Sequence, residues 1–290
     1  MKVISNKLII QTKKNYLTSI VFARAICCLG IIIFHYFCHS NNHSKLLLST
    51  SNSNWGFIYV TCFFSISGIV LYYNYPKNIS IKKFYFKRWK SIFPAYYVSF
   101  LYFYQNRVFH YKKIFYFGNW KKLIFTLFGI DGYLNYKYKT YYIMGEWFTG
   151  AIVIIYILYP IIMYIFNKNK FIIPMILFSG FIIMIKTKYF KISSTRNLIT
   201  CLSSFYFGIF FIRYKYIFLN KIVIFTAFCI NIFLYFKRIH TTVSLLIFLL
   251  QGFTFLIILA YLGIIIMRLN YNIFLMKLID LVIAFSYFIM

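Results

Sequence analysis

Arg24 and His35 stand inside an otherwise apolar run, FARAICCLGIIIFHYF at 22–37. Placing an ionisable side chain in hydrocarbon costs about a few kcal/mol or more, so such residues usually line a protein interior, a cavity or a pathway. The two residues are eleven positions apart, which is three helical turns plus about 20°. A helix therefore projects both from one face, roughly 16 Å apart, or about half of a ~30 Å hydrocarbon core.

His35 has the chemistry of a general base, because imidazole titrates near operating pH and can remove a proton from an attacking hydroxyl. The simpler interpretation of His35 is a packing histidine that bonds across a helical bundle. For Arg24 the simpler interpretation is a structural salt bridge. The chain contains only three acidic residues as partners for it: Asp131, Glu146 and Asp280.

The composition of the chain sets its broad class. Hydrophobic residues make up 62% of the 290 residues and the formal net charge is +29, with a mean hydropathy of +0.75. No soluble domain buries so much apolar surface, so we predict a polytopic membrane protein. The basic residues fall in the breaks between apolar runs, so we expect them to meet anionic membrane lipids and expect no nucleic-acid partner.

We predict an all-α fold, a polytopic transmembrane helical bundle of about nine or ten spans, as a single membrane domain over residues 1–290. A shorter apolar piece at 121–130 is predicted to be a half-span or a re-entrant segment. The predicted spans are 17–38, 55–73, 93–109, 147–166, 171–185, 198–213, 217–236, 243–266 and 273–290.

Basic and aromatic residues alternate in IKKFYFKRWKSIF at 81–93. The pattern is typical of an interfacial helix with lysines among the headgroups and aromatic rings in the acyl boundary. We expect Pro94 to begin the next span, where its missing N–H does no harm.

The distribution of basic residues around the first two spans predicts the orientation. The tail before the first span and the second loop are rich in lysine and arginine, whereas the first loop contains only Lys45. The tail, which we expect to be retained, and the second loop are therefore predicted to be cytoplasmic. Arg24 then lies in the cytoplasmic half of the first helix, and His35 lies near its outer end.

The six cysteines fall in or at the edges of apolar runs, so we predict no disulfide framework. His35, Cys38, His39 and His43 form the one neighbourhood of possible metal ligands. Their spacing matches no familiar metal site, and we predict no metal.

Five parts of the chain resemble, in order, the motifs of the acyltransferase 3 family, membrane enzymes that acylate sugars and other hydroxyl acceptors. The first is the Arg-x10-His helix, the second FFSISGIVLYY with its Phe-Phe-x-x-Ser-Gly pattern, and the third FYFKRWKSIFPAYY with its Ile-x-Pro. The fourth resembles the branch that modifies surface polysaccharides, and the fifth ends at Phe-x-x-Gly. The parts lie at 22–37, 63–73, 84–97, 129–134 with 145–160, and 195–211.

The resemblance implies an O-acetyltransferase of the bacterial inner membrane, with no bound cofactor. Acetyl-CoA would be the donor, and a hydroxyl of a cell-surface polysaccharide or of its lipid-linked precursor would be the acceptor. His35 and Arg24 would be catalytic. Arg24 and Arg88 suit the phosphates of the donor, because arginine pairs well with phosphate. A lipid headgroup contact is the alternative for Arg88.

Asp131 and Glu146 flank one short connection in a chain that has few acids. Either residue can orient His35, bind acceptor hydroxyls, neutralise an arginine or form a structural pair with a nearby lysine. Trp147 and Tyr133 have the rings that stack on sugars, but aromatic residues are also common at membrane boundaries.

The chain departs from the family pattern at three places. The Arg-x-x-Arg motif is reduced to Arg88 and Ser91, and Ile152 and Val153 stand where another branch has acids. IAFSYFIM at 283–290 resembles the start of the last family helix, but the sequence stops before the expected histidine. We therefore expect a shortened C-terminus. The alternatives are an inactive truncated homologue and a non-acylating polysaccharide transporter or polymerase.

Overall fold

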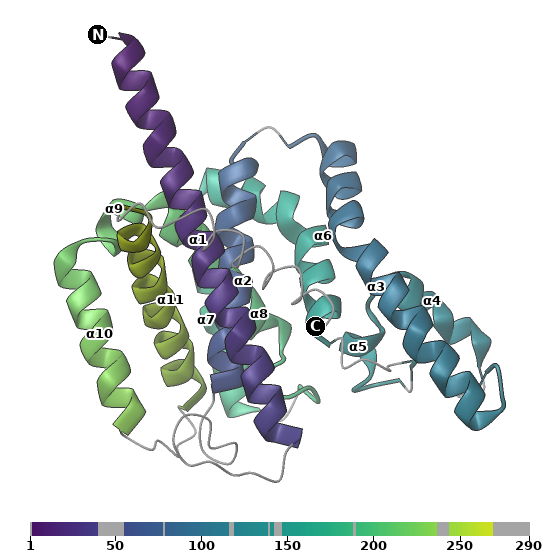
Figure 1. Ribbon diagram of the computed structural model, residues 1–290. Coiled ribbons are helices and arrows are strands. Elements are labelled where there is room, and N and C mark those ends of the chain that lie inside the picture. Colours follow the sequence, from purple (N-terminus) through teal and green to yellow (C-terminus); the bar gives the residue numbers. More distant parts are fainter. Residues whose placement is uncertain are drawn as a thin grey trace. The chain divides into compact units, whose positions relative to one another are not determined.

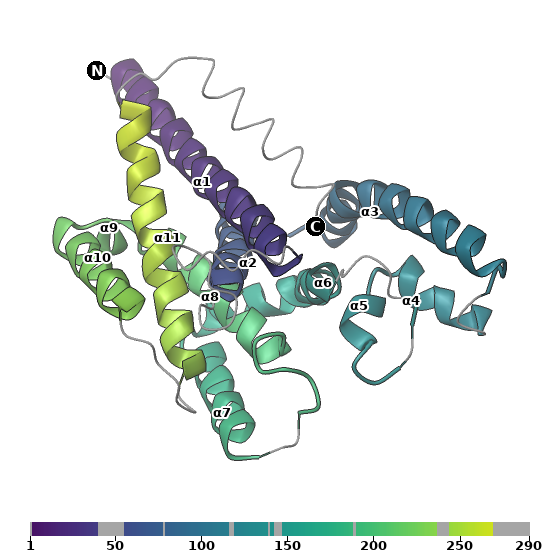
Figure 2. The same ribbon diagram turned by 60° about the horizontal axis from the view of Figure 1, so that its bottom comes forward.

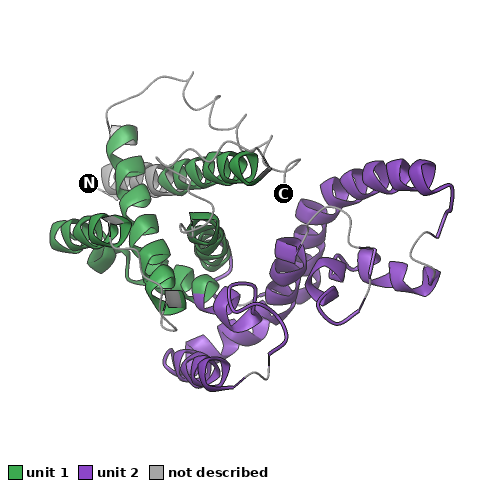
Figure 3. Cartoon of the chain, turned by 90° about the horizontal axis from the view of Figure 1, so that it is seen from below, with its two compact units in different colours: residues 1–73, 204–286 green, residues 74–203, 287–290 purple. Residues whose placement is uncertain are grey.

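The computed structural model describes residues 2–39, 55–77, 79–115, 119–138, 140–141, 147–187, 190–236 and 244–268. Within these ranges all regular elements are helices, which confirms the predicted all-α fold (Figure 1, Figure 2). The chain divides into two compact units, 1–73 with 204–286 and 74–203 with 287–290 (Figure 3). The expectation of one domain over 1–290 stays a prediction.

Unit 1 is discontinuous in sequence, because it combines the first two helices with the last ones. Helix α1 lies along α11, and α10 lies on α11 (Figure 1, Figure 2). The helices of unit 1 are α1 (Lys2–His39), α2 (Trp55–Asn74) as far as Tyr73, α8 (Leu198–Arg213) from Ser204 onward, α9 (Lys215–Phe218), α10 (Lys221–Phe236) and α11 (Ser244–Arg268).

Two glycines bring α2 and α8 into backbone contact. A Cβ atom at Gly208 would fall on the carbonyl oxygen of Ser65, and one at Gly68 would fall on that of Phe205. The Ser65 hydroxyl donates a hydrogen bond of 2.8 Å to the carbonyl oxygen of Ser204. Small residues let helices in a membrane approach this closely, and polar side chains then link them.

Glycines on α11 make similar contacts with α1 and α2. A Cβ at Gly263 would lie 2.8 Å from the Ser19 Cα, and one at Gly252 would lie 2.6 Å from the Thr61 Cγ2. The Cys62 thiol donates to the Gly252 carbonyl at 3.4 Å. Unit 1 is therefore held together at several points by contacts between small residues.

Unit 2 contains the middle of the chain. Helix α3 packs on α6, where the rings of Phe84 and Tyr159 stack with centroids 5.3 Å apart and the Tyr85 hydroxyl donates to the Ile157 carbonyl at 2.8 Å. The elements of unit 2 are α3 (Ile81–Tyr111), the 3-10 turn η1 (Trp120–Lys122), α4 (Leu123–Leu127), α5 (Asp131–Leu134), α6 (Trp147–Lys168), α7 (Ile172–Lys186) and α8 as far as Ser203.

Among the described residues, four helices are long and apolar enough to cross a membrane, and three shorter helices are also apolar. The long segments match four predicted spans within a few residues, whereas the predicted span 273–290 lies outside the described residues. The long segments are Thr18–Cys38, Trp55–Asn74, Trp147–Lys168 and Leu245–Ile266; the shorter helices are Ile172–Lys186, Leu198–Arg213 and Lys221–Tyr235.

Helix boundaries differ from the prediction in three places. Pro94 begins no helix but lies inside α3, which bends partway along its length (Figure 1), because proline removes one backbone hydrogen bond while the flanking turns remain helical. Helix α3, which contains the predicted span 93–109, is not among the four long apolar segments.

The other two differences concern shorter segments. The predicted span 217–236 is divided into α9 and α10, and the Asn220 side chain caps α10 by accepting a 3.0 Å bond from the Ile222 amide. The apolar piece 121–130 forms η1 and α4 followed by Gly129, whose φ is 65°.

Candidate functional site

Helix α1 positions Arg24 and His35. It is helical from Lys2 to His39, so the spacing that places both residues on one face holds. Arg24 is half-buried between the buried residues Ala23 and Ala25, whereas His35 is exposed and its ring meets Phe34 edge to face, with centroids 5.7 Å apart. The structure thus places the proposed base toward the accessible end of the apolar part of α1.

An aromatic ring of α2 packs against the half of α1 that leads to His35. A Cβ at Gly30 would fall on the Tyr59 ring. Tyr59 also meets Trp55 and Phe255, with ring centroids 5.7 Å and 6.1 Å away. His35 therefore follows a segment that packs tightly against the Tyr59 ring of α2, which in turn meets Phe255 of α11.

Arg88 lies on α3 and faces α6. It is half-buried, and its guanidinium carbon lies 5.8 Å from the centroid of the Tyr156 ring. Its Nε is buried and has no hydrogen-bond partner within the described part of the chain. Ser91, at the position of the second arginine of the family motif, donates to the Arg88 carbonyl at 2.9 Å. The Arg88 Nε is therefore a hydrogen-bond donor that the described part of the chain leaves unused.

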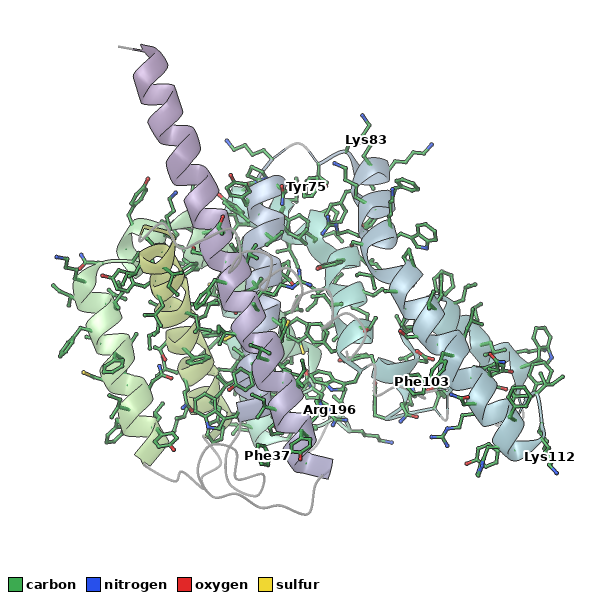
Figure 4. All side chains as sticks on the ribbon, viewed as in Figure 1. Phe37, Tyr75, Lys83, Phe103, Lys112 and Arg196 are labelled. Carbon is green, nitrogen blue, oxygen red and sulfur yellow. The ribbon has the colours of Figure 1, made fainter. Side chains whose placement is uncertain are left out.

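The first turns of α3 are strongly basic, as the sequence pattern predicts. Phe86, Trp89 and Phe93 stack along the helix, with successive centroids 6.4 Å and 6.5 Å apart. The exposed basic residues around Arg88 are Lys82, Lys83, Lys87 and Lys90, and Figure 4 labels Lys83 near the start of α3 and Lys112 at its end. The basic first turns of α3 therefore attract anions.

Asp131 is fully buried, with 0% of its surface exposed. Its carboxylate accepts hydrogen bonds from the Thr126 hydroxyl at 2.7 Å, the Tyr96 hydroxyl at 3.1 Å and the Gly132 amide at 3.1 Å. Burial raises the pKa of the Asp131 carboxyl more than these bonds lower it. Asp131 therefore anchors α3 and α4 to α5, and the donors to its carboxylate among the described residues are two hydroxyls and an amide.

Tyr133 joins α5 to the beginning of α8. Its hydroxyl oxygen accepts a 3.1 Å hydrogen bond from the Leu198 amide. A Cβ added at Gly150 of α6 would lie 2.8 Å from the Tyr133 Cβ, so α6 approaches Tyr133 closely. Burial, with a smaller contribution from Cys201, raises the pKa of Tyr133 to about 12. The hydroxyl therefore stays protonated, and three elements meet at this residue.

The start of α8 contains Arg196 and Asn197, and Arg196 meets Trp147, which lies 49 positions earlier in the chain. Arg196, labelled in Figure 4, lies with its guanidinium carbon 5.4 Å from the centroid of the half-buried Trp147 ring. Asn197 is only 2% exposed and caps the helix, because its Oδ1 accepts a 3.0 Å bond from the Ile199 amide. Its Nδ2 has no hydrogen-bond partner among the residues that the structure describes.

The family model described as an acyltransferase domain matches residues 17–290. The chain belongs to the acyltransferase 3 family. Membership, together with the apolar helices, makes the protein an integral membrane acyltransferase. No curated protein and no solved structure gives a significant match to it.

In this acyltransferase, the candidate residues are divided between the two units. Arg24 and His35 belong to unit 1, and Arg88, Asp131 and Trp147 belong to unit 2. Within unit 2, Trp147 and the Tyr156 ring that meets Arg88 are nine positions apart on α6. They therefore project from opposite faces, roughly 14 Å apart along the axis.

Two residues that the sequence analysis singled out lie outside the part of the chain that the structure describes. These residues are Glu146 and His43. Within the described ranges, no group of three or more His, Cys, Asp or Glu residues is placed to hold a metal ion. All six cysteines are free, and four of them are buried. The catalytic and binding roles of the candidate residues stay predictions.

Arg196 and Asn197 are the residues that sequence reasoning missed. An asparagine directly before an apolar run is a helix N-cap signal, and that signal was available at Asn197. The contact of Arg196 with Trp147 joins residues 49 positions apart, and no local pattern indicates it.

Proposed function

We propose that this acyltransferase transfers an acetyl group from acetyl-CoA to a hydroxyl of a cell-surface polysaccharide or of its lipid-linked precursor. The observation that carries the proposal is the unbroken helix α1, which presents Arg24 and His35 on one face in a chain that belongs to the acyltransferase 3 family. The basic residues of the N-terminal tail and second loop support a cytoplasmic N-terminus in the bacterial inner membrane.

His35 would act as general base in this reaction. Its imidazole removes the proton of the acceptor hydroxyl while that oxygen attacks the thioester carbonyl carbon. A carbon–oxygen bond forms, the carbon–sulfur bond breaks, and the CoA thiolate leaves and takes up a proton from the imidazolium. The exposure of His35 supports this role, because an acceptor hydroxyl must reach the ring.

Arg24 would bind the donor away from the reacting carbon. At roughly 16 Å from His35 along α1, it is too distant to contact the same carbonyl. Acetyl-CoA has a long pantetheine arm between its thioester and its phosphates, and this arm suits two groups separated along one helix. Arg24 therefore suits an anionic part of the donor rather than the developing oxyanion.

Arg88 would bind phosphate of the donor as well. The unpartnered Nε and the exposed lysines around it support this role, since arginine and phosphate form charge-assisted hydrogen bonds. Losing such bonds costs about 1.5–3 kcal/mol, which corresponds to roughly ten- to a hundred-fold in affinity.

The test is transfer of radiolabelled acetyl from acetyl-CoA to surface polysaccharide in membranes that contain equal amounts of each variant. Label should appear with wild type and with the control Lys186→Ala, which changes an exposed lysine at the end of α7, and vanish with His35→Ala. Arg88→Ala should raise the KM for acetyl-CoA about ten-fold or more with a smaller change in kcat. Equal labelling by wild type and His35→Ala removes His35 from catalysis. No labelling by wild type, with native polysaccharide supplied, contradicts the proposed donor and acceptor.

A further inference from the structure

The start of α8 contains an amide group whose donors have no hydrogen-bond partner among the described residues. Asn197 is 98% buried, since only 2% of its surface is exposed. A buried polar group without a partner costs about 1–3 kcal/mol, so its presence calls for an explanation. The unpartnered atom is Nδ2, which can donate two hydrogen bonds and accept none.

The direction of this amide is fixed by the helix cap. Oδ1 accepts from the Ile199 amide at 3.0 Å, so the planar carboxamide is anchored at the N-terminus of α8, and Nδ2 lies at the same helix end. A helix N-terminus favours negative charge because of its dipole. Helix α8 has 16 residues, so its dipole is well developed.

Arg196 adds a cation beside this amide. It precedes Asn197 in the chain, is exposed, and lies over the Trp147 ring at 5.4 Å. An arginine held against an aromatic face is pre-organised and still presents its planar donors outward. Neutral amide donors, a helix N-terminus and a guanidinium therefore belong to neighbouring residues at the start of α8.

We propose that Arg196 and Asn197 bind an oxyanion, a carboxylate or phosphate group, of the acyl acceptor. The inference that the ligand belongs to the acyl acceptor rests on the proposed function. The oxyanion site itself rests on the hydrogen-bond donors at the start of α8. Arg88, which suits the CoA phosphates, meets the opposite face of α6 from Trp147. The site at α8 is thus available to the second substrate.

Variants at Asn197 can separate ligand binding from the helix cap. Serine caps helices about as well as asparagine, so Asn197→Ser keeps the cap and removes the two Nδ2 donors. Asn220→Ser is the matched control, because Asn220 caps α10 in the same way, accepting from the Ile222 amide at 3.0 Å. Arg196→Ala removes the cation and keeps the amide.

The experiment measures ligand-induced shifts of the thermal unfolding temperature of the purified full chain in detergent. The probes are glucuronate, inorganic phosphate, neutral glucose and CoA, each titrated. Wild type and Asn220→Ser should respond to glucuronate or phosphate, and much less to glucose. Asn197→Ser and Arg196→Ala should bind these anions about ten-fold or more weakly, while their response to CoA stays unchanged.

Three outcomes would overturn the proposal. Equal anion responses in wild type and Asn197→Ser would remove Asn197 from the site, and equal responses to glucose and glucuronate would exclude oxyanion recognition. A CoA response that Arg196→Ala abolishes would assign the site to the donor instead. This experiment measures binding and needs no turnover. Its result can therefore be interpreted even if the acetyl-transfer assay of the proposed function fails.

Discussion

Replacing Gly208 by alanine tests the backbone contact between α2 and α8. The added Cβ would fall on the Ser65 carbonyl oxygen, which belongs to a helix backbone and cannot turn aside as a side chain can. The two helices must therefore separate, and the 2.8 Å bond from Ser65 to Ser204 lengthens or breaks. We expect the chain to remain helical but to unfold at a lower temperature.

The magnitude follows from three effects. Overpacking in a close-packed interior costs about 1–3 kcal/mol, and loss of an interhelical hydrogen bond in a membrane costs about 0.6 kcal/mol. Alanine recovers about 1 kcal/mol because glycine is a poor helix former. The net destabilisation is about 2 kcal/mol, or roughly 4–8 °C in unfolding temperature.

The assay is thermal unfolding followed by far-ultraviolet circular dichroism in one detergent. Gly180→Ala is the control, because the three atoms nearest to a Cβ there all belong to the Ile199 side chain, the closest being Cδ1 at 3.0 Å, and none is a backbone atom. Alanine has a higher helix propensity than glycine, and this offsets the small rearrangement of Ile199. Gly180→Ala should therefore unfold near the temperature of the wild type. If Gly208→Ala unfolds at the same temperature as Gly180→Ala, α2 and α8 do not share the contact described above.

Three further predictions concern single side chains. Ser65→Ala should destabilise the protein by about 0.6 kcal/mol, and in a double-mutant cycle its effect should largely vanish in the Gly208→Ala background; additive effects would contradict a shared contact. Tyr133→Phe should cost about 1–3 kcal/mol, because the Leu198 amide loses its acceptor, whereas Tyr85→Phe at the exposed bond to Ile157 should cost much less in the same unfolding assay. The raised pKa of Asp131 means that the folded state holds this proton more tightly than the unfolded state, so its contribution to stability is complete below the ordinary pKa and declines as pH rises through the raised value. Asp131→Asn should therefore gain stability relative to wild type as pH rises above the ordinary carboxyl pKa, as measured by unfolding temperature at a series of pH values; a difference that does not change with pH would mean that the pKa of the Asp131 carboxyl is not raised.

The membrane spans were predictable because the length of an apolar run can be read from consecutive residues of the sequence. Four of the predicted spans coincide with the long apolar helices within a few residues. Pro94 misled the prediction, because a proline also fits inside a long helix that tolerates one missing bond. The break before α10 was readable from Asn220, a strong N-cap residue.

The candidate site was predictable only where residues share one helix. Arg24 and His35 could be related through the helical repeat, because α1 is continuous. Asp131 was found by its rarity, but its three hydrogen bonds come from folding of α3, α4 and α5 around it. The pairing of Arg196 with Trp147 depends on how α6 meets α8, and periodicity contains no information about that.

The division of unit 1 into two stretches of sequence has a consequence for biosynthesis. Gly68 and Gly208 are 140 residues apart, so at about 5–20 residues per second helix α2 waits roughly 7–28 s for its partner. Apart from residues 287–290, unit 2 is continuous from 74 to 203, and this stretch can complete its contacts during that wait. A nascent chain that stalls before residue 204 therefore exposes the Ser65 and Gly68 face of α2 to lipid, and this face is where membrane chaperones and proteases would distinguish unfinished from finished protein.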